Sequence, residues 1–522
     1  MTTLSAAKDV LRGVATLVAV DTRAATPIYS QIYQSFRARI LSAELRAGQL
    51  IPSSRELARY LRVSRFPVLN AYAQLIAEGY FEARVGTGTF VARSLPVTVR
   101  ADTATRATDT PSPLRSISVR TAALPRYAVP YWVNHAGPFQ LGQPALDEFP
   151  LKIWAALTSR CARRLDCTAL RYGNPFGLDD LREVIAAYLR TSRGVRCAAE
   201  QVMIVSGSQQ ALDIATRVLL NPRDRVWIEE PGYWLVRHVL DGAGCRAVPV
   251  PVDAEGLDVE QGIDRCRQAR AAFVAPSHQY PLGVTMSATR RLQLLDWAHS
   301  AGAWIIEDDY DSEYRYDRMP IGSLQGLDAD ARVIYIGTFS KVLFPALRIG
   351  YIVIPVDLVE RFAVVRRSID MCAPYENQRV VADFIRGGHF ARHIRRMRGI
   401  YADRCRTLID AIREQLPGCS IAGAEAGLHV ALLLSHDAAD REIAAAALQR
   451  GVLLAPLSPS YAGTTRRSGF VLGFGTSAAA EIAPAVRVVK QCLSAARALE
   501  GTRRATTRRG SFDRMKSRFL DG

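Results

Sequence analysis

The stretch from Gly337 to Tyr351 constrains the fold and chemistry of this chain more than any other part of its sequence. It contains one lysine, Lys341, which follows small hydroxylated residues and precedes Arg348 by seven positions. Most of its other residues are apolar. A lysine held in a desolvated pocket has a lowered pKa and becomes a usable amine nucleophile. The stretch alone would equally fit a surface lysine between two strands, so the interpretation depends on the sequence upstream.

An apolar run that ends abruptly in acidic residues lies upstream of this lysine. Trp304-Ile305-Ile306 is followed directly by Glu307, Asp308 and Asp309. This pattern is typical of a buried parallel strand whose carboxyl end opens into a ligand crevice. A site for pyridoxal phosphate (PLP) needs a lysine that forms a Schiff base and a carboxylate beside the pyridine nitrogen. The acidic residues that follow this strand could supply that carboxylate, and the sequence alone does not separate the adjacent Asp308 and Asp309.

A PLP site also needs hydrogen-bond donors for the phosphate group. An apolar strand over 202–205 leads into a Ser-Gly-Ser turn, which precedes a helix. Exposed backbone amides at the start of a helix attract phosphate. The residues that we expect to hold the phosphate are therefore Ser206, Gly207, Ser208 and Arg348.

In this order, these motifs are similar to those of the fold-type I aminotransferases. The resemblance implies that Lys341 carries PLP as a Schiff base, that Asp308 pairs with the pyridine nitrogen and that Tyr310 reaches the ring hydroxyl. It also implies that Tyr233 stacks on the cofactor ring. A tyrosine at the position of Tyr172 reaches the phosphate of the partner subunit in that family, which implies a homodimer. Without the resemblance, Tyr233 would equally fit the core and Tyr172 a plain turn.

Two positions depart from the aminotransferase pattern. Tyr280 stands where many of these enzymes have the asparagine of Asn-Pro-x-Gly. In the strand 470–474, Val471 stands where they have an arginine that clamps the substrate carboxylate, and a valine cannot form a bidentate clamp. Arg466 or Arg467 is the alternative source of a clamp. We therefore expect the pocket to sense PLP itself, with a small amino-acid-like effector as the alternative.

The first hundred residues carry a separate pattern of helices followed by a hairpin. A helix after Pro27 places apolar residues at i, i+4 spacing on one face. Ser53 and Glu56 form a capping box for a second helix, and Ser64 caps a third. The side chains of the third helix that we expect to face inward are Val68, Tyr72, Leu75 and Ile76. Two short strands on either side of 86–88 complete a predicted winged helix-turn-helix.

In a winged helix-turn-helix the third helix enters the major groove of double-stranded DNA. The expected DNA contacts are Ser53, Arg55, Ser64, Arg65, Phe66 and Thr87. A small protein-interaction module is the alternative. The phrases Pro52-Ser53-Ser54-Arg55-Glu56-Leu57-Ala58 and Val63-Ser64-Arg65 resemble the GntR-type DNA-binding domain. Phe66-Pro67 departs from the small polar residues usual there: a phenylalanine can contact a thymine methyl group but cannot hydrogen-bond a base.

A GntR-type head joined by a linker to an aminotransferase-like body resembles the MocR family of PLP-dependent transcription regulators. The resemblance implies a regulator that binds promoter or operator DNA and whose body is a sensor. The alternative is a working PLP-dependent aminotransferase with a DNA-binding head. The expected parts are an N-terminal arm (1–26), a winged helix (27–93), a flexible linker (94–130), an α/β PLP-binding domain with a mostly parallel sheet and a smaller α+β subdomain (131–498), and a basic, disordered tail (499–522).

Charge and cysteine usage fit this interpretation. The formal net charge of +17 suggests a polyanionic partner, although an arginine-rich proteome would produce part of it. The nine cysteines are scattered without a Cys-x-x-Cys pair, which predicts reduced thiols, no disulfide framework and no metal site. No apolar run is long enough to span a membrane. We therefore expect a cytoplasmic protein with no membrane partner.

Overall fold

The computed structural model describes residues 14, 18–84, 86–93, 117–118, 121–122, 124, 130, 135–167, 169–316, 322–435, 438–463 and 467–518. The chain divides into two compact units, 1–116 and 117–522. The expected linker lies almost entirely outside the described residues, and so does Arg466. Within the described ranges, no helix is long and apolar enough to cross a membrane.

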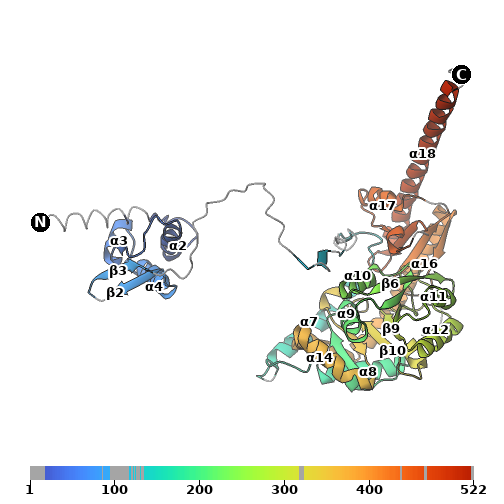
Figure 1. The fold of residues 1–522 in the computed structure, drawn as a ribbon, viewed down its shortest axis with the longest axis horizontal. Coiled ribbons are helices and arrows are strands. Elements are labelled where there is room, and N and C mark those ends of the chain that lie inside the picture. The colour runs from blue at the N-terminus through green and yellow to red at the C-terminus, as the bar shows by residue number, and fades with distance from the viewer. Residues whose placement is uncertain are drawn as a thin grey trace. The chain divides into compact units, whose positions relative to one another are not determined.

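The described part of the N-terminal unit is a winged helix-turn-helix (Figure 1). Ser53 accepts a hydrogen bond from the backbone of Glu56, whose side chain accepts one from the backbone of Ser53, so the predicted capping box is confirmed. The wing is a three-stranded antiparallel sheet in the order β1-β3-β2. The elements are α2 (Ile28–Leu41), β1 (Leu50–Ile51), α3 (Ser54–Leu61), α4 (Arg65–Ala77), β2 (Phe81–Arg84) and β3 (Gly88–Val91).

Three aromatic rings form the centre of this unit. Phe36, Tyr72 and Phe81 meet edge to face, with ring centroids 5.3–5.8 Å apart. The expectation that Ile76 faces inward is wrong, because it is 39% exposed. Successive helical residues turn by about 100°, so Leu75 completes the buried stripe and Ile76 falls outside it. Strand β1 was not expected, because two residues carry no periodic signal.

The segment before α2 is part of the same core. Val14 and Val18 are buried among the apolar side chains of the winged helix. The side-chain amide of Gln31 donates to the carbonyl oxygens of Asp21 and Thr26. The described part of the expected arm is therefore packed against the domain instead of hanging free.

This packing predicts that the arm stabilises the DNA-binding unit. Val18→Ala removes buried methyl groups, and we expect it to lower the free energy of unfolding by roughly 1–3 kcal/mol. Amide hydrogen exchange of α2 and α4 in the full chain measures this locally. Thr22→Ala, at an exposed position of the same segment, is the matched control. Equal exchange in the two variants would contradict the packing role.

An eight-stranded sheet is the framework of the second unit, in the order β4-β11-β10-β9-β8-β5-β6-β7. The central pairs are parallel, while β11 and β7 run antiparallel to their neighbours, so the predicted mostly parallel sheet is confirmed. Its strands are β4 (Val202–Val205), β5 (Arg225–Glu230), β6 (Arg246–Asp253), β7 (Gly256–Leu257), β8 (Ala271–Val274), β9 (Trp304–Asp309), β10 (Val333–Thr338) and β11 (Gly350–Val353).

Helices cover both faces of this sheet. Ile306 packs with α9, α10 and α14 on one face, and its neighbour Ile305 packs with α11 and α12 on the other. The opposite directions follow from the alternation of side chains along a strand. The helices are α7 (Leu151–Arg163), α8 (Asp179–Ser192), α9 (Ser208–Leu219), α10 (Trp234–Ala243), α11 (Val259–Cys266), α12 (Ala288–Ala301), α13 (Leu324–Leu327), α14 (Val359–Asp370) and α15 (Tyr375–Arg386).

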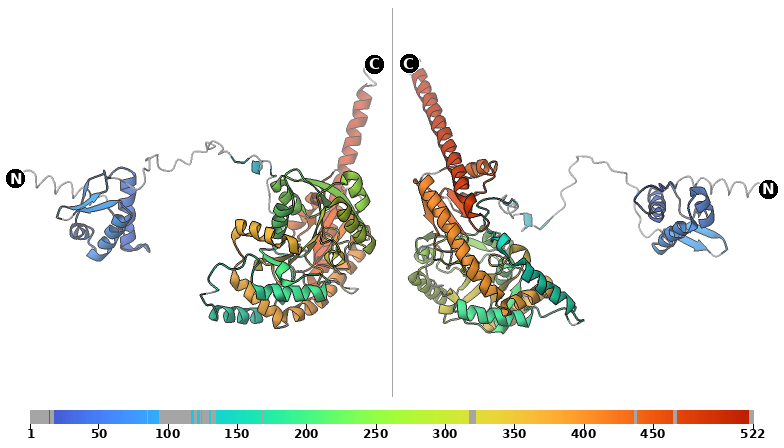
Figure 2. Two further views of the ribbon diagram at one scale, coloured as in Figure 1. Left: turned by 60° about the horizontal axis from the view of Figure 1, so that its bottom comes forward. Right: turned by 180° about the vertical axis from the view of Figure 1, so that it is seen from behind.

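A smaller α+β part follows, as predicted. Its four-stranded antiparallel sheet has the order β12-β13-β15-β14. Helix α16 packs along α18 beside this sheet (Figure 2). The elements are α16 (His389–Gln415), β12 (Cys419–Ala422), β13 (His429–Leu434), α17 (Asp440–Leu448), β14 (Ala455–Pro456), β15 (Gly469–Gly473) and α18 (Ala479–Arg518).

Helix α18 corrects the expectation of a disordered tail. Its first half is anchored by buried residues such as Ile482 and Val489. The backbone stays helical through Arg518, so the expectation for 499–522 is wrong as far as that residue. Six of the twenty residues from 499 to 518 are arginines, which are good helix formers, and they extend a helix that packing has already nucleated.

Candidate functional site

Lys341 follows the carboxyl end of β10, beside the carboxyl end of the parallel strand β9. Its Nζ donates a hydrogen bond to the carbonyl oxygen of Gly142, 2.6 Å away. Burial lowers the pKa of Lys341, and the nearby carboxylates of Asp311 and Asp308 only partly oppose this effect. A lowered pKa favours the neutral amine, the form that attacks a carbonyl group.

The structure separates the two adjacent carboxylates of β9. Asp309 Oδ2 accepts hydrogen bonds from the guanidinium of Arg193 and, at 2.6 Å, from the hydroxyl of Tyr335. Asp308 lies on the other face of the strand, and its buried Oδ1 has no hydrogen-bond partner among the described residues. Burial raises the pKa of Asp308 to about 7. Among the described residues, Asp309 Oδ1 is buried without a partner as well, but Asp309 is already paired with Arg193. The described residues place no such arginine on Asp308, so Asp308 is the better candidate to accept from a buried N–H group.

Arg348 and the start of α9 come together as predicted. Arg348 Nη2 donates to the carbonyl oxygen of Ser206 at 2.5 Å. Gly207 has a φ of +92°, and a Cβ there would lie 2.9 Å from the same nitrogen, so the turn has room only for glycine. Ser208 begins α9. The backbone amide of Ser206 already donates to the side chain of Gln210. The amides that could donate to a phosphate are therefore expected from Gly207 onward.

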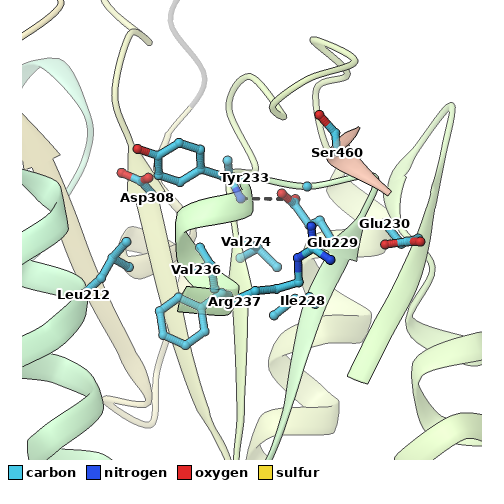
Figure 3. A pocket seen from close by; sticks show the side chains of 13 residues that line it. Leu212, Ile228, Glu229, Glu230, Tyr233, Val236, Arg237, Val274, Asp308 and Ser460 are labelled. Atoms are coloured by element: carbon cyan, nitrogen blue, oxygen red, sulfur yellow. Dashed lines mark hydrogen bonds between the residues drawn. The ribbon is translucent and has the colours of Figure 1, made fainter. Parts of the chain in front are cut away.

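A small cavity of about 30 Å³ lies beneath Asp308 (Figure 3). Tyr233 and Asp308 line one end of it, and Glu229 and Arg237 lie further along its wall. Lys341 and Arg348 do not line it, so the cavity is one part of the candidate site and not the whole. Tyr233 is half-buried with its ring edge to face with that of Tyr280, at 5.8 Å.

Tyr310 belongs to a buried polar cluster that the sequence did not reveal. Its hydroxyl donates to the carbonyl oxygen of His278 at 2.7 Å. His278 Nδ1 lies 3.1 Å from both carboxylate oxygens of Asp311, and the His429 ring is 4.7 Å away. Potential metal-ligand atoms of these two histidines and Asp311 fall within 4.8 Å of one another. Because Asp311 already bonds His278, we interpret the group as a hydrogen-bonded cluster.

The position of the expected carboxylate clamp is apolar. Val471 is fully buried on β15, packed in a cluster with Leu282, Ala431, Ala455, Leu457 and Tyr461. The partly buried Tyr280 packs against the same cluster. Arg467 is exposed, and Arg466 lies outside the described residues. Tyr172 is 84% exposed, so its predicted role depends on a second subunit.

The expected DNA contacts all lie on the surface of the N-terminal unit. A groove between α3, α4 and the wing includes both Ser53 and Thr87. Arg55 and Ser64 are exposed. Ser64 is the N-cap residue of α4, as expected, but its side chain does not form the capping hydrogen bond. Arg65 Nε donates to Ser54 Oγ at 3.1 Å. The sixth expected contact, Phe66, is 70% exposed.

Known proteins match both units. Residues 28–91 match the family model described as bacterial regulatory proteins, gntR family, and residues 139–471 match aminotransferase class I and II. The probable rhizopine catabolism regulatory protein MocR of Rhizobium meliloti is 40% identical over 463 residues, which cover 88% of this chain and 92% of that protein. This chain belongs to the MocR family.

Another relative and a solved structure agree with this family and with the fold of the second unit. The HTH-type pyridoxine biosynthesis transcriptional regulator PdxR of Corynebacterium glutamicum is 31% identical over 460 residues, 88% of this chain and 94% of that protein. The solved structure of the α-aminoadipate aminotransferase LysN from Thermus thermophilus, complexed with N-(5'-phosphopyridoxyl)-L-leucine, matches with a TM-score of 0.68 and 26% identity over 73% of this chain and 98% of that one. The predicted fold and the predicted DNA-binding transcription regulator are confirmed.

The geometry predicts different defects for the two aspartates of this MocR-family protein. Asp308→Asn should weaken PLP binding, because the pyridinium nitrogen would lose a charge-assisted partner. Asp309→Asn should instead cost about 3–5 kcal/mol of stability, because Arg193 would stay buried without its counter-ion. PLP retention on dialysis and the melting temperature measure the two effects. Greater PLP loss in Asp309→Asn, at equal stability, would reverse the assignment.

The raised pKa of Glu229 predicts that the free energy of unfolding depends on pH. It is buried, and desolvation raises its pKa to about 8, against about 4.3 for an unfolded glutamate. Because the folded state holds this proton more tightly, stability should fall as the pH rises from about 5 to 8. We expect the melting temperature of cofactor-free protein to fall less over this range in Glu229→Gln. Glu260→Gln, at an exposed position, should behave like the unmodified protein.

Proposed function

We propose that this MocR-family regulator binds PLP at Lys341 and that PLP is the ligand to which its DNA affinity responds. The observation that carries the proposal is the contrast within one site. Lys341, Asp308 and Arg348 have the chemistry that PLP needs, whereas the position expected to hold the carboxylate of an amino acid is occupied by the buried Val471.

The side chains of the site fit PLP. The unpartnered Asp308 Oδ1 suits the protonated pyridine nitrogen, and Arg348 with the start of α9 suits the phosphate. Tyr233 would cover the ring, and Tyr310 would reach the ring hydroxyl. PLP supplies an aldehyde that forms a Schiff base with a primary amine, and Lys341 has the lowered pKa that suits this attachment.

An amino-acid effector would lack a partner for its carboxylate. A buried unpaired charge costs several kcal/mol. Millimolar binding is worth only about 4 kcal/mol, so this cost would remove it. The apolar side chains around Val471 therefore support PLP itself as the signal, and the name of the relative PdxR, a pyridoxine biosynthesis regulator, points the same way.

A homodimer is part of the proposal. Tyr172 and its neighbour Leu170 are strongly exposed although both are large and apolar, and α7 exposes Leu151 in the same way. Large exposed apolar residues are typical of an interface. A second subunit would bring its own Tyr172 toward the phosphate, and two heads would then read two half-sites in the operator.

Aminotransferase activity is the second candidate. The arrangement of Lys341, Asp308 and Arg348, and the likeness to solved aminotransferases, favour it. An assay with pairs of amino acids and 2-oxo acids separates the two functions. Turnover with any common pair would support the enzyme.

The proposal predicts that PLP changes operator affinity only when Lys341 is present. Cofactor-free protein is titrated with PLP while operator binding is followed by fluorescence anisotropy. Lys341→Ala should abolish both borohydride-fixed cofactor and the response, because no amine remains at that position. Lys490→Ala removes an exposed lysine of α18 and should respond like the unmodified protein.

A second titration tests whether amino acids act as the effector. Common amino acids at millimolar concentration should leave the absorption spectrum of PLP-loaded protein unchanged. A rapid spectral change with one amino acid, together with a matching shift in DNA affinity, would show an amino-acid sensor and reject PLP as the signal.

A further inference from the structure

The DNA-facing helix of this regulator has a mainly apolar outer surface. Phe66 is 70% exposed, Leu69 42% and Ile76 39%, and the exposed Ala73 lies between them on the same face of α4. An outward helix face in a globular domain is normally polar. Because this helix is the one that a winged helix-turn-helix inserts into the major groove, its apolar surface bears on how bases are read.

The polar side chains of α4 are few and partly engaged. Arg65 is tied through Nε to Ser54 Oγ at the start of α3, which directs it toward the helix-turn boundary. The amide of Gln74 donates to Glu78 at 2.9 Å. Asn70 is exposed in the second turn, beside Phe66 and Leu69 on the outer surface. The first two turns therefore present two large apolar side chains and one amide.

Positive charge lies beside this apolar surface, on α3 and the turn that leads into α4. Between residues 53 and 66 the chain carries four exposed arginines, Arg55, Arg59, Arg62 and Arg65, and a single acidic residue, Glu56. Arginines on α3 and the turn suit the phosphates along the edge of the groove, which position a protein without reading sequence. An apolar helix face flanked by arginines fits the major groove better than it fits an apolar protein partner.

The chemistry of the bases narrows the choice further. Thymine is the base that offers a methyl group in the major groove, and adenine is the base that pairs with an asparagine amide through two hydrogen bonds. The commonest reader of guanine is arginine or lysine. On α4 that leaves Arg65 alone, at the first position of the helix, with its Nε bonded to Ser54 Oγ.

We propose that α4 recognises A·T base pairs through thymine methyl groups, with Phe66 and Leu69 as the residues that determine specificity and Asn70 as the reader of adenine. The inference rests on the DNA-binding unit alone and is independent of what the second unit binds. It also defines the operator chemically: each half-site contains thymines whose methyl groups are in contact with α4.

Replacement of thymine by uracil tests this directly, because it removes the methyl group and leaves base pairing intact. Full-length protein with PLP selects its operator from random duplex DNA, and each thymine of the half-site is then replaced by deoxyuridine. Burial of one methyl group is worth about 0.8 kcal/mol, so we expect affinity to fall about fourfold at each contacted position.

Variants assign the effect to side chains. Phe66→Ala should erase the difference between thymine and uracil at one position, and Leu69→Ala at another, while the salt dependence of binding stays unchanged. Tyr60→Ala, which removes an exposed aromatic ring from α3, is the matched control and should keep both differences. Equal affinity for thymine and uracil at every position of the selected operator would overturn the proposal, and so would a Phe66→Ala, Leu69→Ala double variant that retains the full difference.

Discussion

The buried ion pair between Arg193 and Asp309 determines how the end of β9 can be used. The pair is almost inaccessible to solvent, and Tyr335 and Ser277 add hydrogen bonds to Asp309 Oδ2 and to the guanidinium of Arg193. Because β9 alternates its side chains between faces, fixing Asp309 on one side directs Asp308 to the other, toward the cavity. The two neighbouring aspartates therefore differ in environment: Asp309 is held in a buried ion pair, and Asp308 faces the cavity.

Burial of the Asp308 and Glu229 carboxylates costs free energy. Burial raises the pKa of Asp308 to about 7, and it raises that of Glu229, also on the cavity wall, to about 8. Both carboxylates are poorly solvated, and Asp308 Oδ1 also lacks a partner among the described residues, whereas Glu229 accepts hydrogen bonds from Ala275 and Gln279. A ligand that donates a hydrogen bond to Asp308 would offset part of the free energy that its burial costs.

The sequence predicted what local signals determine. The capping box at Ser53, the strand that ends in acidic residues and the glycine turn before α9 each lie within a few residues, and all three are present. Family resemblance added the order of these motifs, and with it the two-unit architecture. The apolar replacement at Val471 was also readable, because it is a single substitution in a recognisable strand.

Contacts between distant residues were not predictable in the same way. The choice between Asp308 and Asp309 depends on Arg193, more than a hundred positions earlier. The residues of the cluster, His278, Asp311 and His429, come from three separate segments of the chain. No sequence motif with a fixed spacing therefore predicts it. Helix α18 was misjudged because composition describes a segment alone, whereas its helix continues from a packed start.

The hydrogen bond from Lys341 to Gly142 has a consequence for ligand attachment. A molecule that forms a covalent bond with Lys341 Nζ would displace the hydrogen bond to the Gly142 carbonyl oxygen. Gly142 lies near the beginning of the second unit, on the same stretch of chain that continues back into the linker. A ligand attached at Nζ would therefore remove one backbone contact from a segment near the beginning of the second unit.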